Sequence, residues 1–220
     1  MRRGIMAFQR ARNEKQVEAR RLEIRKAVEK LYSDGCLANV TFTNISKLTS
    51  ISRPAIYKYH TTREEVILNM LQGRVESFRH SVIGHFPESD FVTREEFCKR
   101  LLDCILQHED MLRLMAVQNT VLETNVRFEK LVEYKQVVMG IYDDFDRILG
   151  RQCPENTHEE LYGFEFALLL NFCAIFPFIE PRPMQRKATR AVKPDYEFQS
   201  FERAISQNLK IITLQLRFSK

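Results

Sequence analysis

Apolar residues recur every three or four positions along almost all of this 220-residue chain, and this spacing constrains the fold more than any other feature. Residues three and four apart share one face of an α-helix, whereas a half-buried strand requires strict alternation, which does not appear. Only seven glycines and seven prolines interrupt the pattern. The sequence therefore predicts an all-α protein.

Residues that start and stop helices divide this pattern into elements. A first helix is expected over about 17–34, with a buried stripe from Ile24 to Tyr32 and Gly35 as its C-terminal stop. Capping boxes, in which a Thr and a Glu three residues later satisfy each other's backbone amides, are expected at Thr62, Thr93 and Thr157. Further helices are expected over about 94–107, 110–123, 126–149, 158–178 and 195–218, with an exposed loop over 180–194.

Charge is distributed unevenly along the chain. The first 80 residues hold 16 Lys and Arg against 8 Asp and Glu, whereas the remainder holds 18 against 21. This asymmetry favours a polyanion partner for a domain over 1–80 and another task for a domain over 81–220. A solvated basic helix is the alternative explanation for the N-terminal charge.

Several functional classes lack support in the sequence. The five cysteines are widely spaced, without a C-x-x-C pair, so we expect reduced thiols and neither a metal nor a cofactor. The most apolar segment, 164–179, is interrupted by Glu165, Asn171 and Pro177 and is interpreted as too short to span a membrane. Because no catalytic motif emerges either, we expect a cytoplasmic protein that is not an enzyme.

Residues 43–60 match a helix-turn-helix. Thr43 is expected to cap a short helix, a tight turn follows at 49–51, and a second helix begins at Ser52 and ends near Tyr59. These helices should close a small core with the first helix through Ile45, Leu48, Ile51 and Ile56. The other face of the second helix is then free to enter the major groove of DNA.

The residue types on this free face suit DNA. Arg53 could make a bidentate contact to guanine, while Pro54 and Ala55 could pack on a thymine methyl group. The candidate contacts are Thr43, Arg53, Pro54, Ala55, Tyr57, Lys58, Tyr59 and Arg63. The alternative is that the tyrosines are core residues and that Arg53 and Lys58 only solubilise the helix.

The stretch from Arg21 to Leu71 resembles the DNA-binding domain of the tetracycline-repressor family. The resemblance lies in Gly35, Thr41, the pattern Ile45-Ser-x-x-Thr-x-Ile-Ser, Tyr57-Lys-Tyr-His and Arg63-Glu64. The sequence departs from the family pattern at Ser50, where a turn glycine is usual, at His60 for phenylalanine and at Arg63 for lysine. The resemblance implies a homodimer that binds a double-stranded DNA operator through the eight candidate contacts.

A basic extension precedes the first helix. Its cations are Arg2, Arg3, Arg10, Arg12, Lys15, Arg20 and Arg21. Arms of this composition can enter a minor groove beside a recognition helix, and each neutralised phosphate adds affinity. A frayed, solvated tail is the alternative.

The C-terminal part is expected to dimerise and to bind an effector. If the family architecture holds, the helices over 158–178 and 196–218 pair with their twofold mates. The interface candidates are Phe164, Leu168, Phe172, Phe201, Ile205 and Leu209, although each could instead fill the protomer's own core. An apolar or aromatic effector could be lined by Phe97, Leu101, Met111, Met115, Phe128, Tyr142 and Phe145, but a plain hydrophobic core explains these residues better, so no ligand contact is assigned.

These observations predict a transcriptional regulator, specifically a repressor that a small-molecule effector releases from a palindromic operator. One alternative is a regulator without an effector. Another is an all-helical small-molecule-binding protein or enzyme whose helix-turn-helix serves only for packing.

Overall fold

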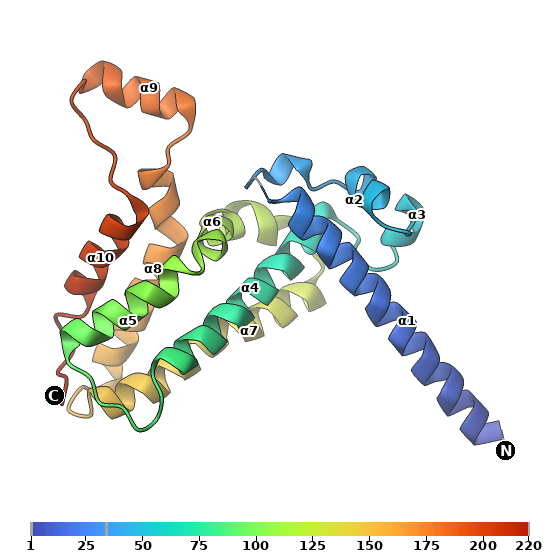
Figure 1. Cartoon of the computed structure of the whole chain (residues 1–220), viewed down its shortest axis with the longest axis horizontal. Coiled ribbons are helices and arrows are strands. Elements are labelled where there is room, and N and C mark those ends of the chain that lie inside the picture. The colour runs from blue at the N-terminus through green and yellow to red at the C-terminus, as the bar shows by residue number, and fades with distance from the viewer. Residues whose placement is uncertain (1, 34, 220) are drawn as a thin grey trace. The chain divides into compact units, whose positions relative to one another are not determined.

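The computed structural model describes residues 2–33 and 35–219, and of residues 2–14 it describes only the backbone. Helices dominate the described residues, among which no β-strand occurs, so the predicted all-α class is confirmed (Figure 1). The elements in chain order are α1 (Arg2–Leu31), η1 (Leu37–Asn39), α2 (Phe42–Leu48), α3 (Arg53–Ile56), α4 (Arg63–His85), α5 (Arg94–Leu106), α6 (Glu109–Val117), η2 (Gln118–Leu122), η3 (Glu123–Asn125), α7 (Phe128–Gln152), α8 (His158–Ile179), α9 (Pro183–Val192) and α10 (Phe201–Ile212). Elements η1 and η3 are 3₁₀ turns, and η2 is a π-helical turn.

The chain folds as two compact units. The N-terminal unit contains the residues up to Met70 together with 122–131, and the C-terminal unit contains 71–121 and the residues from Val132 onward. The predicted division near residue 80 falls inside α4, which contributes residues to both units, as does α7. A short segment from the middle of the sequence thus completes the N-terminal unit.

The N-terminal unit is built on the apolar stripe of α1. Ile24, Ala27, Val28 and Tyr32 are buried, and α1 packs against α2, which in turn packs against α3. Gly35 follows this helix with φ of +73°, a conformation that residues with a side chain rarely adopt. The predicted stripe and stop signal are therefore both present, although α1 begins at Arg2, well before residue 17.

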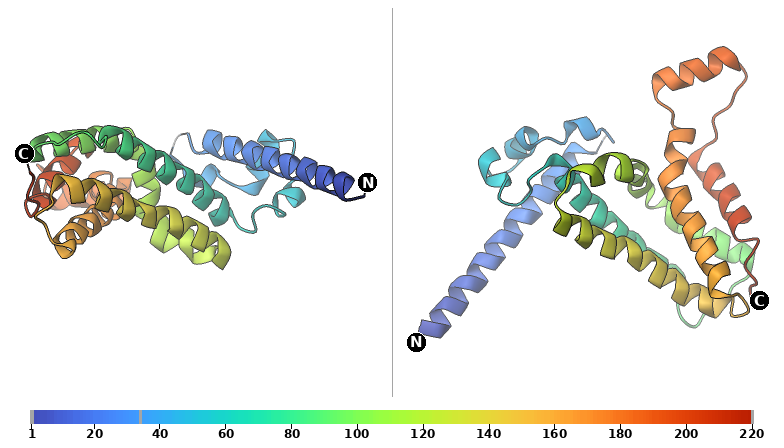
Figure 2. Two further views of the ribbon diagram at one scale, coloured as in Figure 1. Left: turned by 90° about the horizontal axis from the view of Figure 1, so that it is seen from below. Right: turned by 180° about the vertical axis from the view of Figure 1, so that it is seen from behind.

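In the C-terminal unit, α8 packs against α6 and α10, and α10 also packs against α5. Beyond Met70, α4 runs beside α7 (Figures 1 and 2). Aromatic rings fill the interior, with the Phe78 and Phe172 centroids 5.4 Å apart and Phe164 within 6.0 Å of both Phe97 and Phe145. Edge-on ring pairs of this kind add to the stability gained from apolar burial.

One buried ion pair joins α4 to α7. The Arg79 Nε lies 2.6 Å from Asp144 Oδ2, and Arg147 donates to the other carboxylate oxygen at 2.9 Å. Gly140 leaves the space that the Arg79 guanidinium occupies, because a Cβ at this position would overlap it. The carboxylate of Asp144, only 4% exposed, is thereby paired on both oxygens.

Several predicted helix starts need correction. Thr41, not Thr43, caps α2, since its hydroxyl oxygen accepts the Asn44 amide at 3.1 Å. The capping box at Thr157 is complete. At Thr62 and Thr93 only the threonine half forms, because the glutamates three residues later bond to other groups.

The predicted loop over 180–194 contains a helix, α9, and the last helix begins at Phe201, later than expected. Pro183 occupies the first position of α9, where its missing N–H has no intrahelical acceptor to satisfy. From Met184 to Val192 the segment contains neither glycine nor proline. The expectation of a loop was wrong because a composition rich in Pro, Arg and Lys is also compatible with a short helix that begins at a proline.

The predicted dimer-interface residues lie in the protomer's own core, the alternative that the sequence left open. All of them are buried in the protomer itself, at 9% exposure or less: Phe164, Leu168, Phe172, Phe201, Ile205 and Leu209. They form the core between α8, α10 and their neighbours, so their side chains are not available to a second copy. The exposed apolar residues of α8 are different ones, Tyr162, Phe166, Leu170 and Phe178.

Helix α8 is long enough and, because apolar residues lie on both of its sides, hydrophobic enough to cross a membrane, judged by length and composition alone. This finding differs from the expectation that the segment is too short. In the structure, one side of α8 packs into the protein core, as in the core helix of a folded domain.

Candidate nucleic-acid interface

Helices α2 and α3 form the predicted helix-turn-helix. Ser52 is the N-cap residue of α3, and Pro54 lies in its first turn, where a missing N–H costs no hydrogen bond. Helix α3 ends at Ile56, and 3₁₀-type bonds continue the chain, from Lys58 N to Ala55 O and from Tyr59 N to Ile56 O. The predicted second helix is therefore one short helix followed by a tight turn.

Ser50, where the resembled family has glycine, is accommodated without strain. Among the described residues only a glycine has a positive φ, so this turn does not need the left-handed conformation. The Ser50 amide and hydroxyl both donate to the Glu23 carboxylate, and Arg20 Nη1 donates to the hydroxyl oxygen at 2.7 Å. The backbone bond from Ser50 is the main reason that the pKa of Glu23 lies below its usual value. The serine thus ties the turn to α1.

The small core behind the helix-turn-helix contains three of the four predicted residues. Ile45, Ile51 and Ile56 are at most 4% exposed, whereas Leu48 is 41% exposed and lies outside the core. Burial of these isoleucines against α1 fixes α2 and α3 as one rigid element.

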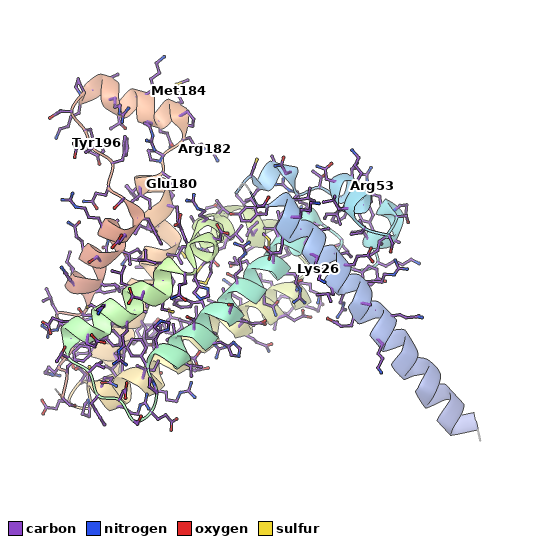
Figure 3. All side chains as sticks on the ribbon, in the orientation of Figure 1. Lys26, Arg53, Glu180, Arg182, Met184 and Tyr196 are labelled. Carbon is purple, nitrogen blue, oxygen red and sulfur yellow. The ribbon has the colours of Figure 1, made fainter. Side chains whose placement is uncertain are left out.

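The predicted DNA-contact residues lie on the solvent side of this core. Thr43, Arg53, Pro54, Tyr57 and Lys58 are exposed, while Ala55 and Tyr59 are half-buried. Figure 3 labels Arg53 at this surface. Within the described part of the chain, Arg53 and Lys58 form no ion pair or side-chain hydrogen bond, so both cations are available to an anionic partner.

Tyr57 has a mixed environment. Its ring packs edge-on against Phe42, with centroids 4.7 Å apart, yet 47% of the residue is exposed. The ring therefore packs on one side while nearly half of the residue faces solvent. This arrangement combines the two readings of the sequence, a packed aromatic and an accessible contact residue.

Arg63 differs from the other candidates. Its guanidinium donates to the Leu37 carbonyl, and its Nε is buried without a partner. Together with Thr43, Arg53 and Tyr57 it lines an open hollow of about 300 Å³. An anion entering this hollow could supply the acceptor that the Arg63 Nε lacks.

Further cations lie on α1. Lys15, Arg20, Arg21 and Lys26 are exposed, which places a basic surface in the same unit as the helix-turn-helix. In the predicted basic N-terminal extension, the backbone is helical from Arg2 onward. The side chains of Arg2, Arg3, Arg10 and Arg12 lie outside the described residues.

A buried carboxylate anchors the segment that follows the helix-turn-helix. The Glu65 side chain is fully buried and accepts from the Thr61 amide at 2.8 Å and the Thr61 hydroxyl at 2.9 Å. Arg127 donates from Nε and Nη2 at 2.7 and 2.9 Å and from its backbone amide at 3.1 Å. Desolvation alone would raise the pKa of Glu65, but these hydrogen bonds outweigh it and hold the pKa at about 2.

Sequence reasoning missed this Glu65–Arg127 pair. The local spacing assigned Glu65 to a capping box with Thr62, and no pattern links it to a residue 62 positions later. Arg127 becomes its partner because residues 122–131 fold into the N-terminal unit. Thr62 adds a second link to this segment by donating to the Asn125 carbonyl at 2.7 Å.

His60 is buried next to this pair. It is 8% exposed, and its Nδ1 has no hydrogen-bond partner. Burial lowers the pKa of His60 to about 4, although the nearby Glu65 carboxylate opposes this shift. A neutral imidazole thus occupies the position where the resembled family has phenylalanine.

The predicted effector pocket is not assembled in the structure. Phe97, Leu101, Met111, Met115 and Phe145 fill the core of the C-terminal unit, whereas Phe128 is 75% exposed and Tyr142 is half-buried at the surface. An open groove of about 500 Å³ lies elsewhere, between α5 and α10. Its lining residues are Arg94, Glu95, Cys98, Lys99, Leu102, Ser206, Lys210, Thr213 and Leu214.

Solved structures of similar fold are known. One similar solved structure is the transcriptional regulator FadR from Bacillus subtilis in complex with stearoyl-CoA, with 9% identity, a TM-score of 0.53, and coverage of 89% of this chain and 99% of that chain. Another is SmeT, the repressor of the Stenotrophomonas maltophilia multidrug efflux pump SmeDEF, with 13% identity, a TM-score of 0.55, and coverage of 89% of each chain. Among curated protein sequences, no match was found.

A sequence profile gives the family. The profile described as the C-terminal domain of tetracyclin repressor-like proteins matches residues 74–215, which is more than half of the chain. The resemblance seen in residues 21–71 and this match cover adjoining parts of the sequence. The chain therefore belongs to the tetracycline-repressor family of transcription regulators.

Proposed function

We propose that this protein is a transcriptional repressor that holds its operator through the helix-turn-helix and releases it when a small molecule binds the C-terminal unit. The observation that carries the proposal is the pair of exposed, unpaired cations, Arg53 and Lys58, on a helix-turn-helix backed by buried isoleucines. Family membership supports it, as do the repressor SmeT and the ligand-bound regulator FadR among the structures of similar fold.

The two cations have different roles in the proposed complex. Arg53 lies at the start of α3, where a recognition helix meets base edges, and its planar guanidinium suits a bidentate contact to guanine. Lys58 lies in the turn after α3 and suits a phosphate, as does Thr43 at the start of α2. Pro54 and Ala55 offer apolar surface to a thymine methyl group. Arg63 would join them by leaving the Leu37 carbonyl for a phosphate.

We propose a homodimer on a palindromic operator, with an interface different from the residues that the sequence suggested. Tyr162, Phe166 and Leu170 recur at intervals of four along α8, and Phe178 follows near the end of the helix; all four are between 47% and 77% exposed. Ile211, 64% exposed, adds to the apolar surface on the neighbouring helix α10. A stripe of this length on one helix can bury itself against the same stripe of a second copy.

The groove between α5 and α10 is our candidate effector site. Its volume of about 500 Å³ suits a small molecule. Leu102, Cys98 and Leu214 provide apolar lining, while Lys99, Lys210 and Arg94 provide positive charge, and the Arg94 Nε is buried without a partner. These features favour an apolar effector that carries an anionic group. We propose that the protein binds such a ligand in the cytoplasm without chemically converting it.

Coupling of the two functions is proposed to run through α4 and α7, which contribute residues to both units. An effector that prefers one arrangement of these helices shifts the protein toward it and changes its affinity for DNA. The Glu65–Arg127 pair ties α4 to the residue just before α7, so both helices act on the DNA-binding unit together.

Duplex binding tests the proposal directly. Fluorescence anisotropy with a genomic-fragment pool should show salt-dependent binding by the native chain and strongly reduced binding by Arg53→Ala/Lys58→Ala. A matched control, Arg147→Ala/Arg203→Ala, removes the same charge from α7 and α10 and should bind as the native chain does. Absence of duplex binding at low salt would instead support a helical small-molecule-binding protein or enzyme.

A further inference from the structure

Helix α9 has no core of its own. None of its residues is buried, and Met184 and Val192 are 75% and 89% exposed. Figures 1 and 3 show α9 held between two extended segments, away from the other helices of the C-terminal unit. The Arg186 guanidinium lies 5.0 Å from the centre of the Phe198 ring in the segment that follows α9. A ten-residue helix with so little packing is marginal in water. Another surface is therefore needed to stabilise it.

The segment that contains α9 is anchored to the C-terminal unit at both of its ends. Glu180, at the end of α8, pairs with Arg113 of α6, and Arg113 also lies 4.5 Å from the centre of the Phe176 ring. At the other end, Phe201 stacks on Phe176 with centroids 5.2 Å apart. The chain thus leaves and re-enters the C-terminal unit at one fixed place. Residues 181–194, which we term the arm, project from it.

The arm is strongly basic. It carries Arg182, Arg186, Lys187, Arg190 and Lys193 and no acidic residue. Without these five cations, the C-terminal unit holds 13 Lys and Arg against 20 Asp and Glu. The charge of the arm is therefore opposite to that of the unit from which it projects, which favours attraction between the arm and the rest of such a unit.

An unmatched acidic cluster lies where α7 and α8 meet. Glu165 of α8 is 3% exposed, and its Oε1 is buried without a hydrogen-bond partner. Burial, with Asp146 and Asp143 of α7 nearby, raises the pKa of Glu165 to about 8. Within the described residues none of these three carboxyl groups forms an ion pair. The cluster lacks the cations that would normally offset its charge.

The arm of the same protomer starts far from this cluster. Glu165 and Glu180 are separated by most of α8, which corresponds to roughly 20 Å at 1.5 Å per residue. An antiparallel pairing of two α8 stripes changes this relationship, because it brings the Phe178 end of one copy beside the Tyr162 end of the other. The arm of one copy then emerges next to the acidic cluster of its mate.

We infer that the arm docks on a second copy of this chain, with Arg186, Lys187 and Arg190 facing Asp143 and Asp146 where α7 meets α8. This inference rests on the proposed dimer and names a second contact within it. Docking would bury Met184 and Val192, which solvent now surrounds, and would supply cations to carboxyl groups that lack them. Each protomer would thus complete the other's surface.

Site-specific photocrosslinking in the full-length protein tests the inference. A benzophenone amino acid at Met184 should yield a covalent dimer whose crosslinked peptide, identified by mass spectrometry, lies within residues 133–166. The same probe at Lys99, exposed on α5, is the matched control and should give no crosslink to this region. Arg186→Glu/Arg190→Glu should reduce the Met184 crosslink by about tenfold, and pairing it with an Asp143→Arg/Asp146→Arg mate should restore it.

The possible outcomes distinguish failure of the proposed arm contact from failure of the proposed dimer. Sedimentation of a monomer at all concentrations would overturn both proposals. A dimer without the Met184 crosslink, or with a crosslink to another surface, would overturn the arm contact and leave the dimer intact. A crosslinking pattern that changes only when DNA or anionic vesicles are added would assign the arm to those partners and contradict docking on a second copy.

Discussion

Arg127 donates hydrogen bonds to the buried carboxylate of Glu65 from its guanidinium, at 2.7 and 2.9 Å, and from its own backbone amide, at 3.1 Å. The pair brings together residues from the start of α4 and from the segment before α7, both in the N-terminal unit. Glu65 also accepts a hydrogen bond from the backbone amide of Thr61, which directly follows the helix-turn-helix in sequence. The integrity of the N-terminal unit therefore depends on a residue far from the helix-turn-helix in sequence.

Replacing Arg127 should destabilise the protein. Arg127→Met would leave the Glu65 carboxylate buried without its guanidinium, at an expected cost of about 3 kcal/mol in the free energy of unfolding. Arg147→Met is the matched control, because Arg147 is 54% exposed and its partner Asp144 retains Arg79; we expect a loss below about 1 kcal/mol. Urea unfolding followed by circular dichroism measures both, and equal losses would contradict the assigned role of Arg127.

The burial of His60 should make the free energy of unfolding sensitive to acid. Its pKa in the folded state is about 4, below the usual 6.5, so between these pH values the unfolded state binds more protons and stability falls as pH falls. The expected loss is about 3 kcal/mol on going from pH 7 to below pH 4. The charges that act on this imidazole are those of Glu65, Lys130, Arg21 and Arg127.

His60→Phe is the variant that isolates this effect, because it removes the titrating group and restores the residue usual at this position in the family. Its unfolding free energy should change much less between pH 6.5 and 4 than that of the native chain. The contribution of Glu65, whose pKa is about 2, is lost only below about pH 4.5 and stays in both proteins. Parallel pH profiles for the two proteins would contradict burial of a neutral His60.

Replacing Arg53 and replacing Lys58 should weaken DNA binding in different ways. Arg53→Ala is expected to cost about 1–3 kcal/mol in operator binding and to relax specificity at one base pair, because it removes a base contact. Lys58→Ala should weaken binding to all sequences alike and lower the slope of log affinity against log salt by about 1. Competition binding against single-base operator variants, repeated across salt concentrations, separates the two. A uniform loss for Arg53→Ala would reject a base-reading role.

Substitutions in the exposed stripe of α8 should affect dimerisation, whereas substitutions in the buried stripe should affect stability. Phe166→Glu should give a folded monomer, because Phe166 is 47% exposed and charge is incompatible with the proposed interface. Phe164→Ala should instead lower stability by about 3–5 kcal/mol, since its side chain is fully buried. Phe128→Glu, at a 75% exposed phenylalanine, is the control for added charge. Sedimentation velocity and thermal unfolding measure these outcomes, and a dimeric Phe166→Glu would reject the revised interface.

The comparison of sequence and structure shows where periodicity is sufficient. The stripe of α1, the Gly35 stop and the outward face of α3 follow from local spacing, so all were predicted. On α8 the residues Phe164, Leu168 and Phe172 and the residues Tyr162, Phe166 and Leu170 form two stripes with the same spacing, offset by two positions. Spacing alone could not decide which of the two stripes faces the protomer's core.

Other features depend on contacts distant in sequence. Arg127 could not be assigned to Glu65, and Ser50 could not be assigned to Glu23, because both partnerships exist only after the chain has folded. The serine at the turn, which departs from the family pattern, is explained by its bonds to α1. Helix α9 escaped prediction because its composition is equally typical of a basic loop.

Selection of bound duplexes from a random pool tests the central claim most directly. The native chain should enrich a twofold-symmetric sequence whose half-sites lie about one helical turn, or a multiple of it, apart. Arg53→Ala should retain the symmetry and lose preference at one position in each half-site. Enrichment of no sequence over the starting pool, or the same preference for Arg53→Ala as for the native chain, would contradict the account.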